Sequence, residues 1–396
     1  KDENNNWKLD IVRSDCDFMN YFINTCRVHW KEELRDLKPS EYDNYLDENK
    51  FIINKETLSE DQIYEQELHF INKVYSFGYM LHRYKDPAKA WCLYIMDNEV
   101  VDDNESHGRT GKSIFSSHAL RLFMNSKYLG ARKKGLLESD FLYDGITEQT
   151  DYVLFDDADK RFQFQQLFTD ITGDLNVNPK NQNAYLIPFY LSPKFCISTN
   201  YAPYGLDSST RGRILFMSFG NWYHGEIEGF TERNPMHDFN NRFFTDWDEK
   251  QWNLFLNFAM QCLQFYLSTN EKIGAPEGNI RKRNLLAEIG IVFFEWAEDY
   301  FKDENINQAV CRRVMYENLK NYNNSMKQIS ATSFKNKLKQ FCELKGYIFN
   351  PKDQLTDKAG QRIMKWTDSK TEEHFFIQVP EESAEETNNE QDDIFF

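Results

Sequence analysis

Short apolar runs, set far apart between more polar segments, constrain the fold of this chain of 396 residues more than any other feature. They lie at 90–96, 152–155, 194–199 and 214–219. A continuous apolar run is typical of a strand that is buried on both faces. Helices are expected between the runs, at 113–126 and 161–171. Because strands that alternate with helices form parallel sheets, we expect an α/β fold with a mostly parallel sheet.

A phosphate-binding loop is expected after the first run, where residues 105–113 read Glu-Ser-His-Gly-Arg-Thr-Gly-Lys-Ser. Such a loop aims backbone N–H groups at phosphates from a helix N-terminus, and adds a lysine for charge and a hydroxyl for magnesium. The usual pattern has glycine where this chain has Ser106, so Gly108 is expected to supply the flexibility. The candidate nucleotide-binding residues are Ser106, His107, Gly108, Arg109, Thr110, Gly111, Lys112 and Ser113.

Polar residues end the next two runs. Asp156 and Asp157 follow one of them, and an acidic pair at a buried strand end is costly unless it has a task. In a hydrolase, Asp156 would hold Mg²⁺ through water and Asp157 would polarise the attacking water. Asn200 ends the run at 194–199, where an amide can hydrogen-bond the γ-phosphate and that water. The alternatives are solvated carboxylates at a strand end and a turn-forming asparagine.

Basic residues occupy two further positions. Arg211 and Arg213 flank a glycine before the last run, and an arginine supplied by a neighbouring subunit can neutralise charge on a γ-phosphate in the transition state. The segment 173–185 is polar and turn-rich, which predicts a hairpin with Lys180 at its tip. A pair of surface arginines and a solvated lysine are the alternatives.

In this order and spacing, the region from about 70 to 225 resembles superfamily 3 helicases, most closely the primase–helicases of phages and poxviruses. The segments Ile-Ser-Thr-Asn-Tyr at 197–201 and Arg-Gly-Arg at 211–213 match that family, and Ser106 departs from it. The resemblance implies an AAA+-like P-loop ATPase that uses ATP and Mg²⁺, forms a hexameric ring and moves along single-stranded DNA to open forked duplexes. It implies that Lys180 contacts DNA, that Ser113 and Asp156 hold the metal, and that catalysis depends on Lys112, Asp156, Asp157, Asn200, Arg211 and Arg213.

Four segments are expected along the chain. Residues 1–82 show helical periodicity and predict a domain for packing or oligomerisation. Residues 83–302 form the ATPase domain with a helical extension, and residues 303–380 have the element order of a winged helix. The helix that would recognise DNA there carries Lys335, Lys337 and Lys339, although a solvated helix face is the alternative. The family also implies an upstream primase domain, and the start at Lys1 instead of Met predicts a fragment of a longer protein.

The acidic segment 381–396 predicts a disordered tail. Its end resembles the C-terminal tip of bacterial single-stranded-DNA-binding proteins, with Phe395 in place of the usual proline. The resemblance implies binding to host replication proteins that recognise such tips, and a tail that only solubilises the chain is the alternative. The candidate partner-binding residues are Asp392, Asp393, Ile394, Phe395 and Phe396.

The net charge of −16 is concentrated at the ends of the chain. Residues 1–70 carry −8 and residues 381–396 carry −7, so the 310 residues between them carry −1 and remain able to bind DNA locally. The seven cysteines form no Cys-x-x-Cys pair, which favours reduced thiols over disulfides or zinc. No secretory signal or membrane span is evident, so we expect the cytoplasm of a bacterial host.

The sequence therefore predicts an ATP-dependent DNA helicase that acts in the replication of a phage or mobile element. Two other functions stay open. One is an ATPase that remodels or packages DNA–protein complexes without unwinding DNA. The other is a DNA-binding adaptor with a weak or inactive nucleotide site, which recruits host replication factors through its acidic tip.

Overall fold

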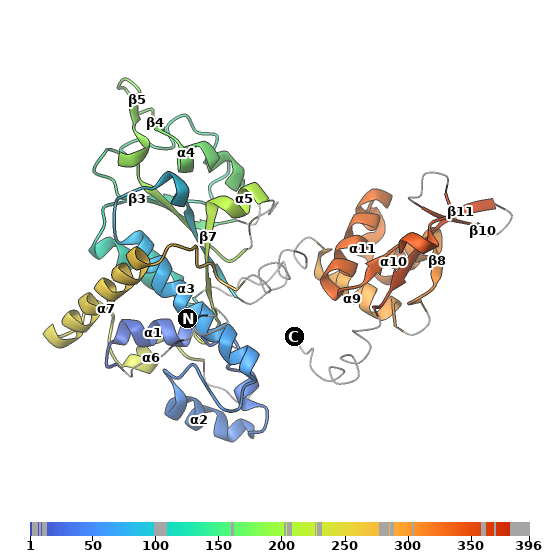
Figure 1. The fold of residues 1–396 in the computed structure, drawn as a ribbon, viewed down its shortest axis with the longest axis horizontal. Coiled ribbons are helices and arrows are strands. Elements are labelled where there is room, and N and C mark those ends of the chain that lie inside the picture. The colour runs from blue at the N-terminus through green and yellow to red at the C-terminus, as the bar shows by residue number, and fades with distance from the viewer. Residues whose placement is uncertain are drawn as a thin grey trace. The chain divides into compact units, whose positions relative to one another are not determined.

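The structure is a computed structural model of the chain, and it divides into two compact units, Lys1–Ile280 and Arg281–Phe396 (Figure 1). The described residues are 1, 7, 9, 14–98, 109–159, 162–201, 203, 208–225, 227, 232–276, 285, 289–302, 305–357, 362–367 and 370–380.

A parallel sheet of five strands forms the centre of the first unit. In spatial order β2-β3-β6-β1-β7, every neighbouring pair is parallel. Three of the strands are buried along their whole length, which explains their continuous apolar sequences. The predicted α/β class with a parallel sheet is confirmed. The strands are β1 (Cys92–Asp97), β2 (Ser126–Gly130), β3 (Tyr152–Ala158), β6 (Lys194–Thr199) and β7 (Ile214–Phe219).

The edge strand β2 is not among the strands predicted from the sequence. It reads Ser-Lys-Tyr-Leu-Gly and has no buried residue, so no apolar run marks it. The helix expected at 113–126 was therefore predicted too long. It ends with η4 (Ile114–Ala119) and η5 (Leu120–Leu122), before the chain enters β2. The helix expected at 161–171 is shorter as well, and consists of η6 (Phe164–Leu167) and α4 (Phe168–Thr172).

Helices from both ends of the first unit share a core with the sheet. Phe18 of α1 packs against Phe77 of α3 and Phe255 of α7, with ring centroids 5.6 Å and 5.0 Å away. The same cluster includes Leu93 of β1 and Leu215 of β7. The compact units divide after Ile280, and the boundaries of the four expected segments stay predictions. Besides α4, the α-helices described in this unit are α1 (Asp17–Cys26), α2 (Tyr42–Asn49), α3 (Glu60–Met80), α5 (Ser208–Arg213), α6 (Pro235–Phe239) and α7 (Glu249–Ser268).

One face of α7 is open to solvent. Leu256, Met260 and Leu267 are 42%, 60% and 65% exposed. The near-continuous apolar sequence of this helix would favour burial all round, but these three residues are exposed. The buried residues Phe255, Phe258 and Cys262 lie on the side that packs against α1 and α3.

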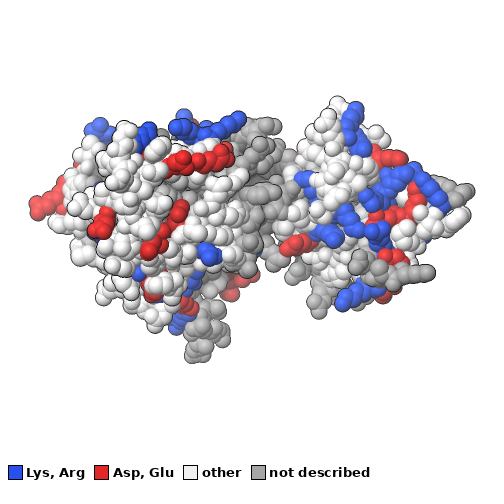
Figure 2. All heavy atoms as spheres, turned by 90° about the horizontal axis from the view of Figure 1, so that it is seen from above, with Lys and Arg blue, Asp and Glu red and all other residues white. Residues whose placement is uncertain are grey.

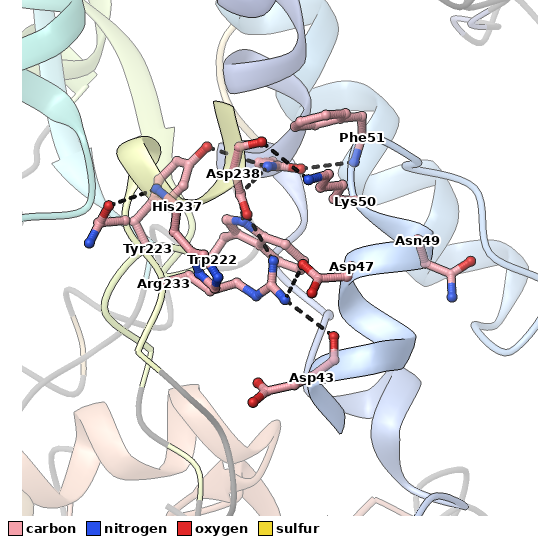
Figure 3. A network of polar contacts seen from close by, with 12 residues as sticks. Asp43, Asp47, Asn49, Lys50, Phe51, Trp222, Tyr223, Arg233, His237 and Asp238 are labelled. Carbon is pink, nitrogen blue, oxygen red and sulfur yellow. Dashed lines mark hydrogen bonds and ion pairs between the residues drawn. The ribbon is translucent and has the colours of Figure 1, made fainter. Parts of the chain in front are cut away.

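A buried polar network joins the N-terminal helices to the segment after β7 (Figure 3). Asp238 accepts hydrogen bonds from Arg233 at 2.8 Å, from the Trp222 indole at 2.7 Å and from Asn24 at 2.8 Å. A second bond from Arg233 reaches Asp47 at 2.7 Å. The buried charges of Arg233 and Asp238 are paired and hydrogen-bonded, which offsets the cost of burying them.

We expect the stability of the first unit to depend on pH through His29, which follows α1. Burial lowers the pKa of His29, but hydrogen bonds to Glu32 and Glu65 outweigh it and raise the pKa to about 9. This folded-state pKa lies above the unfolded value, so the stabilisation is complete below about pH 6.5 and is lost as the pH rises through about 9. We expect the free energy of unfolding to fall by roughly 1–2 kcal/mol across this window.

Denaturant titrations at several pH values measure this change. His29→Gln is expected to remove the decrease, whereas a matched change at the exposed His237 is expected to preserve it. An unchanged pH profile in His29→Gln contradicts the assignment.

In the described part of the second unit, helices pack against a small antiparallel sheet. Phe293 of α9, Phe334 of α11 and Phe375 of β11 share its core. Ser330 accepts a hydrogen bond from the Ser333 N–H at 3.1 Å and so caps the N-terminus of the lysine-rich helix. The elements are α9 (Ile291–Tyr300), β8 (Ala309–Cys311), α10 (Arg312–Tyr322), α11 (Ala331–Lys345), β9 (Ile348–Phe349), β10 (Ile363–Thr367) and β11 (Lys370–Gln378).

Candidate functional site

The carboxyl ends of β3, β6 and β1 lie side by side in the middle of the sheet. After β1 the chain crosses to β2 at one edge, and the last strand, β7, lies on the opposite side of β1. Ligands of open α/β sheets bind outside the carboxyl ends at such a switch in strand order. The residues that follow these strands therefore form the candidate site.

Lys112 lies at the centre of the site. Its Nζ is 2.5 Å from Oδ1 of Asp97 and 2.9 Å from Oδ1 of Asn200. The Thr110 hydroxyl donates to the same Asp97 oxygen at 2.5 Å. The side chains of Lys112 and Asp97 are only 8% and 6% exposed, so water screens this ion pair little. The lysine of the expected phosphate loop thus contacts the asparagine expected to bind a γ-phosphate.

The acidic pair lies at the end of the next strand, β3. Asp156 accepts a hydrogen bond from the Tyr128 hydroxyl at 3.0 Å, and Asp157 lies 2.6 Å from Nε of Arg132. The pairing of β3 with β6 is irregular between Phe155 and Ala158, and Asp157 has a φ of 58°. A bulge of this kind re-aims side chains at a strand end, so the two carboxylates leave the strand in different directions.

The phosphate loop is described only in part. Ser106, His107 and Gly108 lie outside the described residues, and Arg109 is exposed. Gly111 has a φ of 100°, and its carbonyl accepts a 2.7 Å hydrogen bond from the hydroxyl of Tyr21. A Cβ at Gly111 would lie 2.8 Å from the Tyr21 ring, so only glycine fits between the loop and α1.

The two candidate arginines have different surroundings. Arg213 donates to the Ser209 hydroxyl at 2.8 Å, and its guanidinium lies 4.6 Å from the centre of the Phe168 ring. Arg211 is half-buried, and its carbonyl accepts a 3.0 Å hydrogen bond from Lys272. Arg213 is therefore held within its own subunit.

The hairpin expected at 173–185 is present. Its strands are β4 (Leu175–Val177) and β5 (Tyr185–Ile187), which pair antiparallel. Lys180 is exposed in the turn between them, at the end of the first unit where Figure 1 labels both strands. Its backbone N–H donates to Asp144 at 3.3 Å.

The lysines expected to contact DNA bind groups of their own unit. Lys335 lies 3.0 Å from Glu373, and the Lys337 amine donates to the Ile289 carbonyl. Lys339 lies 5.9 Å from the Phe349 ring centre. Figure 2 shows blue side chains in a band across this unit, with red ones between them. Asp392, Asp393, Ile394, Phe395 and Phe396 lie outside the described residues, so their binding to host proteins stays a prediction.

The residues at the site fit a magnesium nucleotide. Among the described residues, no three His, Cys, Asp or Glu side chains gather as a metal site. Mg²⁺ typically takes one or two protein oxygens and completes its coordination with water and phosphate. The Ser113 hydroxyl and the Asp156 carboxylate would supply those oxygens, and they are the hard ligands that this ion prefers.

Sequence reasoning missed three residues of interest. Asp97 follows the apolar run of β1, as Asp156 and Asn200 follow the apolar runs of β3 and β6. Its position in the sequence could therefore have identified it as a candidate site residue. Tyr21 reaches the loop across 90 residues of sequence, and no local pattern announces that contact. Trp366 in β10 is 74% exposed, and nothing in the local sequence indicates that exposure.

Comparisons with known proteins do not identify a family for this chain. No family model and no curated protein matches the chain. Two solved apo structures of the C-terminal region of NrS-1 are similar to it, each at 13% identity. One covers 93% of this chain and 78% of its own, with a TM-score of 0.39. The other covers 79% and 70%, with a TM-score of 0.35. TM-scores this low support no inference about the fold or function of this chain.

No helix in the described ranges is long and apolar enough to cross a membrane.

Proposed function

We propose that this chain is a DNA-stimulated ATPase of the superfamily 3 helicase type, which serves replication of a phage or mobile element. One observation carries the proposal: Lys112, Asn200 and Asp97 meet at the switch in strand order. A lysine at a helix N-terminus beside an amide from the neighbouring strand suits a terminal phosphate and the water that attacks it.

Each residue has a task in phosphoryl transfer to water. Lys112 exchanges Asp97 for phosphate oxygens, and Asn200 orients the attacking water. Asp157 accepts a hydrogen bond from that water, while Asp156 and Ser113 are the residues that would hold Mg²⁺. The metal, when bound, neutralises charge that develops on the transferred group.

The ring form of the proposal needs an arginine from a neighbouring subunit. Arg213 is engaged with Ser209 and Phe168 of its own chain. Arg211 and Arg213 are the two candidates for this contribution to the neighbouring nucleotide. Lys180, exposed at its hairpin tip, is assigned to the DNA that passes through the ring.

The test is the rate of ATP hydrolysis with and without single-stranded DNA. Asp157→Asn is expected to lower the rate about 100-fold, because it removes the group that polarises water. Asparagine tolerates the positive φ at this position, so the loop keeps its conformation. Asp36→Asn, at an exposed aspartate outside the site, is the matched control.

Each outcome distinguishes among the candidate functions. ATP hydrolysis with strand displacement on a forked substrate supports the helicase, and hydrolysis without displacement supports an ATPase that remodels or packages complexes. DNA binding without hydrolysis supports the adaptor. A wild-type protein that neither hydrolyses ATP nor assembles on DNA contradicts the proposal.

We further assign DNA binding to the C-terminal unit. Residues 281–380 carry 17 Lys and Arg against 13 Asp and Glu, a net charge of +4 in a chain of net charge −16. Trp366 lies opposite Thr371, and Met364 lies opposite Glu373, which binds Lys335 of α11. Opposite residues of an antiparallel pair point to the same face, so Trp366 shares the face that α11 covers. An indole that is 74% exposed suits a stacked base.

Trp366→Ala is expected to weaken binding of single-stranded DNA about tenfold, since stacking of one base contributes roughly 1–3 kcal/mol. Fluorescence anisotropy with a labelled oligonucleotide measures the change. Trp366→Phe is expected to retain most of the affinity, and Tyr84→Ala, at another exposed aromatic residue, is the control. Equal affinities for Trp366→Ala and wild type would exclude the stacking role.

A further inference from the structure

The carboxylate of Asp97 contacts the donors of the phosphate loop. Its Oδ1 lies 2.5 Å from Nζ of Lys112, and the same oxygen accepts a 2.5 Å hydrogen bond from the Thr110 hydroxyl. A carboxylate and a phosphate both present anionic oxygens, which lysine amines and hydroxyl groups bind in the same way. Asp97 therefore engages groups that a phosphate oxygen would use.

The backbone of the sheet fixes the position of Asp97. It is the last residue of β1, which lies between β6 and β7, and it pairs with Phe219 of β7. The N–H of Asn98 donates to the Phe219 carbonyl at 2.7 Å, and the Asn98 side chain accepts a 3.0 Å hydrogen bond from the Ser218 hydroxyl. The carboxylate therefore stays beside the loop when Lys112 turns to another partner.

Burial makes an exchange of partners at Lys112 costly. The side chains of Asp97 and Lys112 are 6% and 8% exposed, so water and salt screen their charges little. When Lys112 binds a phosphate instead, the Asp97 carboxylate loses its cation, and a buried charge without its counterion is strongly unfavourable.

Repulsion adds a second cost to the same exchange. The displaced carboxylate remains close to the incoming phosphates, and like charges at short range repel most strongly where little water lies between them. Asn200, which also contacts the Lys112 amine, is neutral and supplies no charge to offset this repulsion. The geometry therefore predicts that Asp97 opposes the binding of phosphates.

We propose that Asp97 is a fixed anionic competitor that sets the nucleotide affinity of this site, an inference that rests on the proposed function. The phosphates of the nucleotide must displace the carboxylate from Lys112, and the displaced charge stays beside them. The nucleotide is therefore bound less tightly than the loop and Lys112 alone would bind it. Weaker binding favours release of ADP and phosphate after hydrolysis.

The test measures binding of ATP and of inorganic tripolyphosphate, each with Mg²⁺, by calorimetry. Asp97→Asn removes the competing charge and keeps an oxygen that can accept from Lys112 and Thr110. We expect this variant to bind both compounds at least about tenfold more tightly than the wild type, since it no longer has a buried ion pair to break. Asp97→Ser is a second neutral variant with the same expected result, should Asp97→Asn fail to fold.

Asp151→Asn is the matched control. Asp151 is also a buried carboxylate in an ion pair, 7% exposed and 2.6 Å from Nε of Arg83. It precedes β3, and so lies at the opposite end of that strand from the acidic pair. This variant loses the same charge from the protein, and we expect its affinities for both compounds to equal those of the wild type.

The outcomes separate this inference from the function on which it rests. Unchanged or weaker binding by a folded neutral variant of Asp97 overturns the competitor role and leaves the nucleotide site intact. Tighter binding of ATP alone, or equally tighter binding by Asp151→Asn, also overturns that role. Failure of the wild type and of every variant to bind either compound overturns the nucleotide site itself.

Discussion

Lys112→Ala is expected to lower DNA-stimulated ATP hydrolysis by at least about 100-fold, the usual effect of removing one positioned group that stabilises charge in a transition state. Its amine is the cation that already lies between the ends of β1 and β6. Steady-state phosphate release, measured at saturating single-stranded DNA, reports the loss. A variant that keeps more than a tenth of the wild-type rate contradicts the assignment of this lysine.

The control must separate lost chemistry from lost folding. Lys112→Ala leaves the Asp97 carboxylate, which is 6% exposed, without its cation, and breaking a buried pair in this way costs about 3–5 kcal/mol. The double variant Asp97→Asn/Lys112→Ala removes both charges. We expect it to regain stability but not activity. Recovery of hydrolysis in the double variant would show that Lys112 serves only the fold.

Gly78→Ala is expected to destabilise the first unit by roughly 3 kcal/mol, because α3 and α7 approach each other most closely there. A Cβ at Gly78 would lie 2.1 Å from the Cys262 carbonyl oxygen and 2.7 Å from Cβ of Tyr266. Since the nearest of these atoms belong to the backbone, the helices must separate to admit a methyl group. Far-UV circular dichroism during thermal unfolding measures the effect.

The direction of the stability change in Gly78→Ala distinguishes close packing of α3 on α7 from free space at this position. In a helix with free space, alanine in place of glycine stabilises by about 1 kcal/mol. Stabilisation by Gly78→Ala therefore contradicts the close packing of α3 on α7. Gly274→Ala is the matched control, because a Cβ at Gly274 meets no atom within 4 Å and a change near zero is expected.

The central strands could be predicted because burial on both faces demands continuous apolar sequence, as in β1 and β6. The edge strand β2 could not be predicted, since none of its residues is buried and its sequence resembles a loop. The exposed face of α7 could not be predicted for a related reason. Apolar composition alone does not reveal which side of a helix lacks a neighbour.

Some features of the candidate site could also be predicted from the sequence, and others could not. Lys112, Asp156 and Asn200 could be chosen from the sequence, because each polar residue follows a buried run or opens a helix behind a loop. The sequence does not reveal that Lys335 and Lys337 bind groups of their own unit, since those partners lie 38 and 48 residues away.

By itself, the sequence determined the parallel sheet and the polar residues at its carboxyl edge, because burial and strand ends leave local patterns. Only the tertiary structure decided that Asp97 holds Lys112 beside Asn200 and that Tyr21 supports the loop at Gly111. These contacts depend on which strands and helices become neighbours, and strand order is set by the packing of the whole unit.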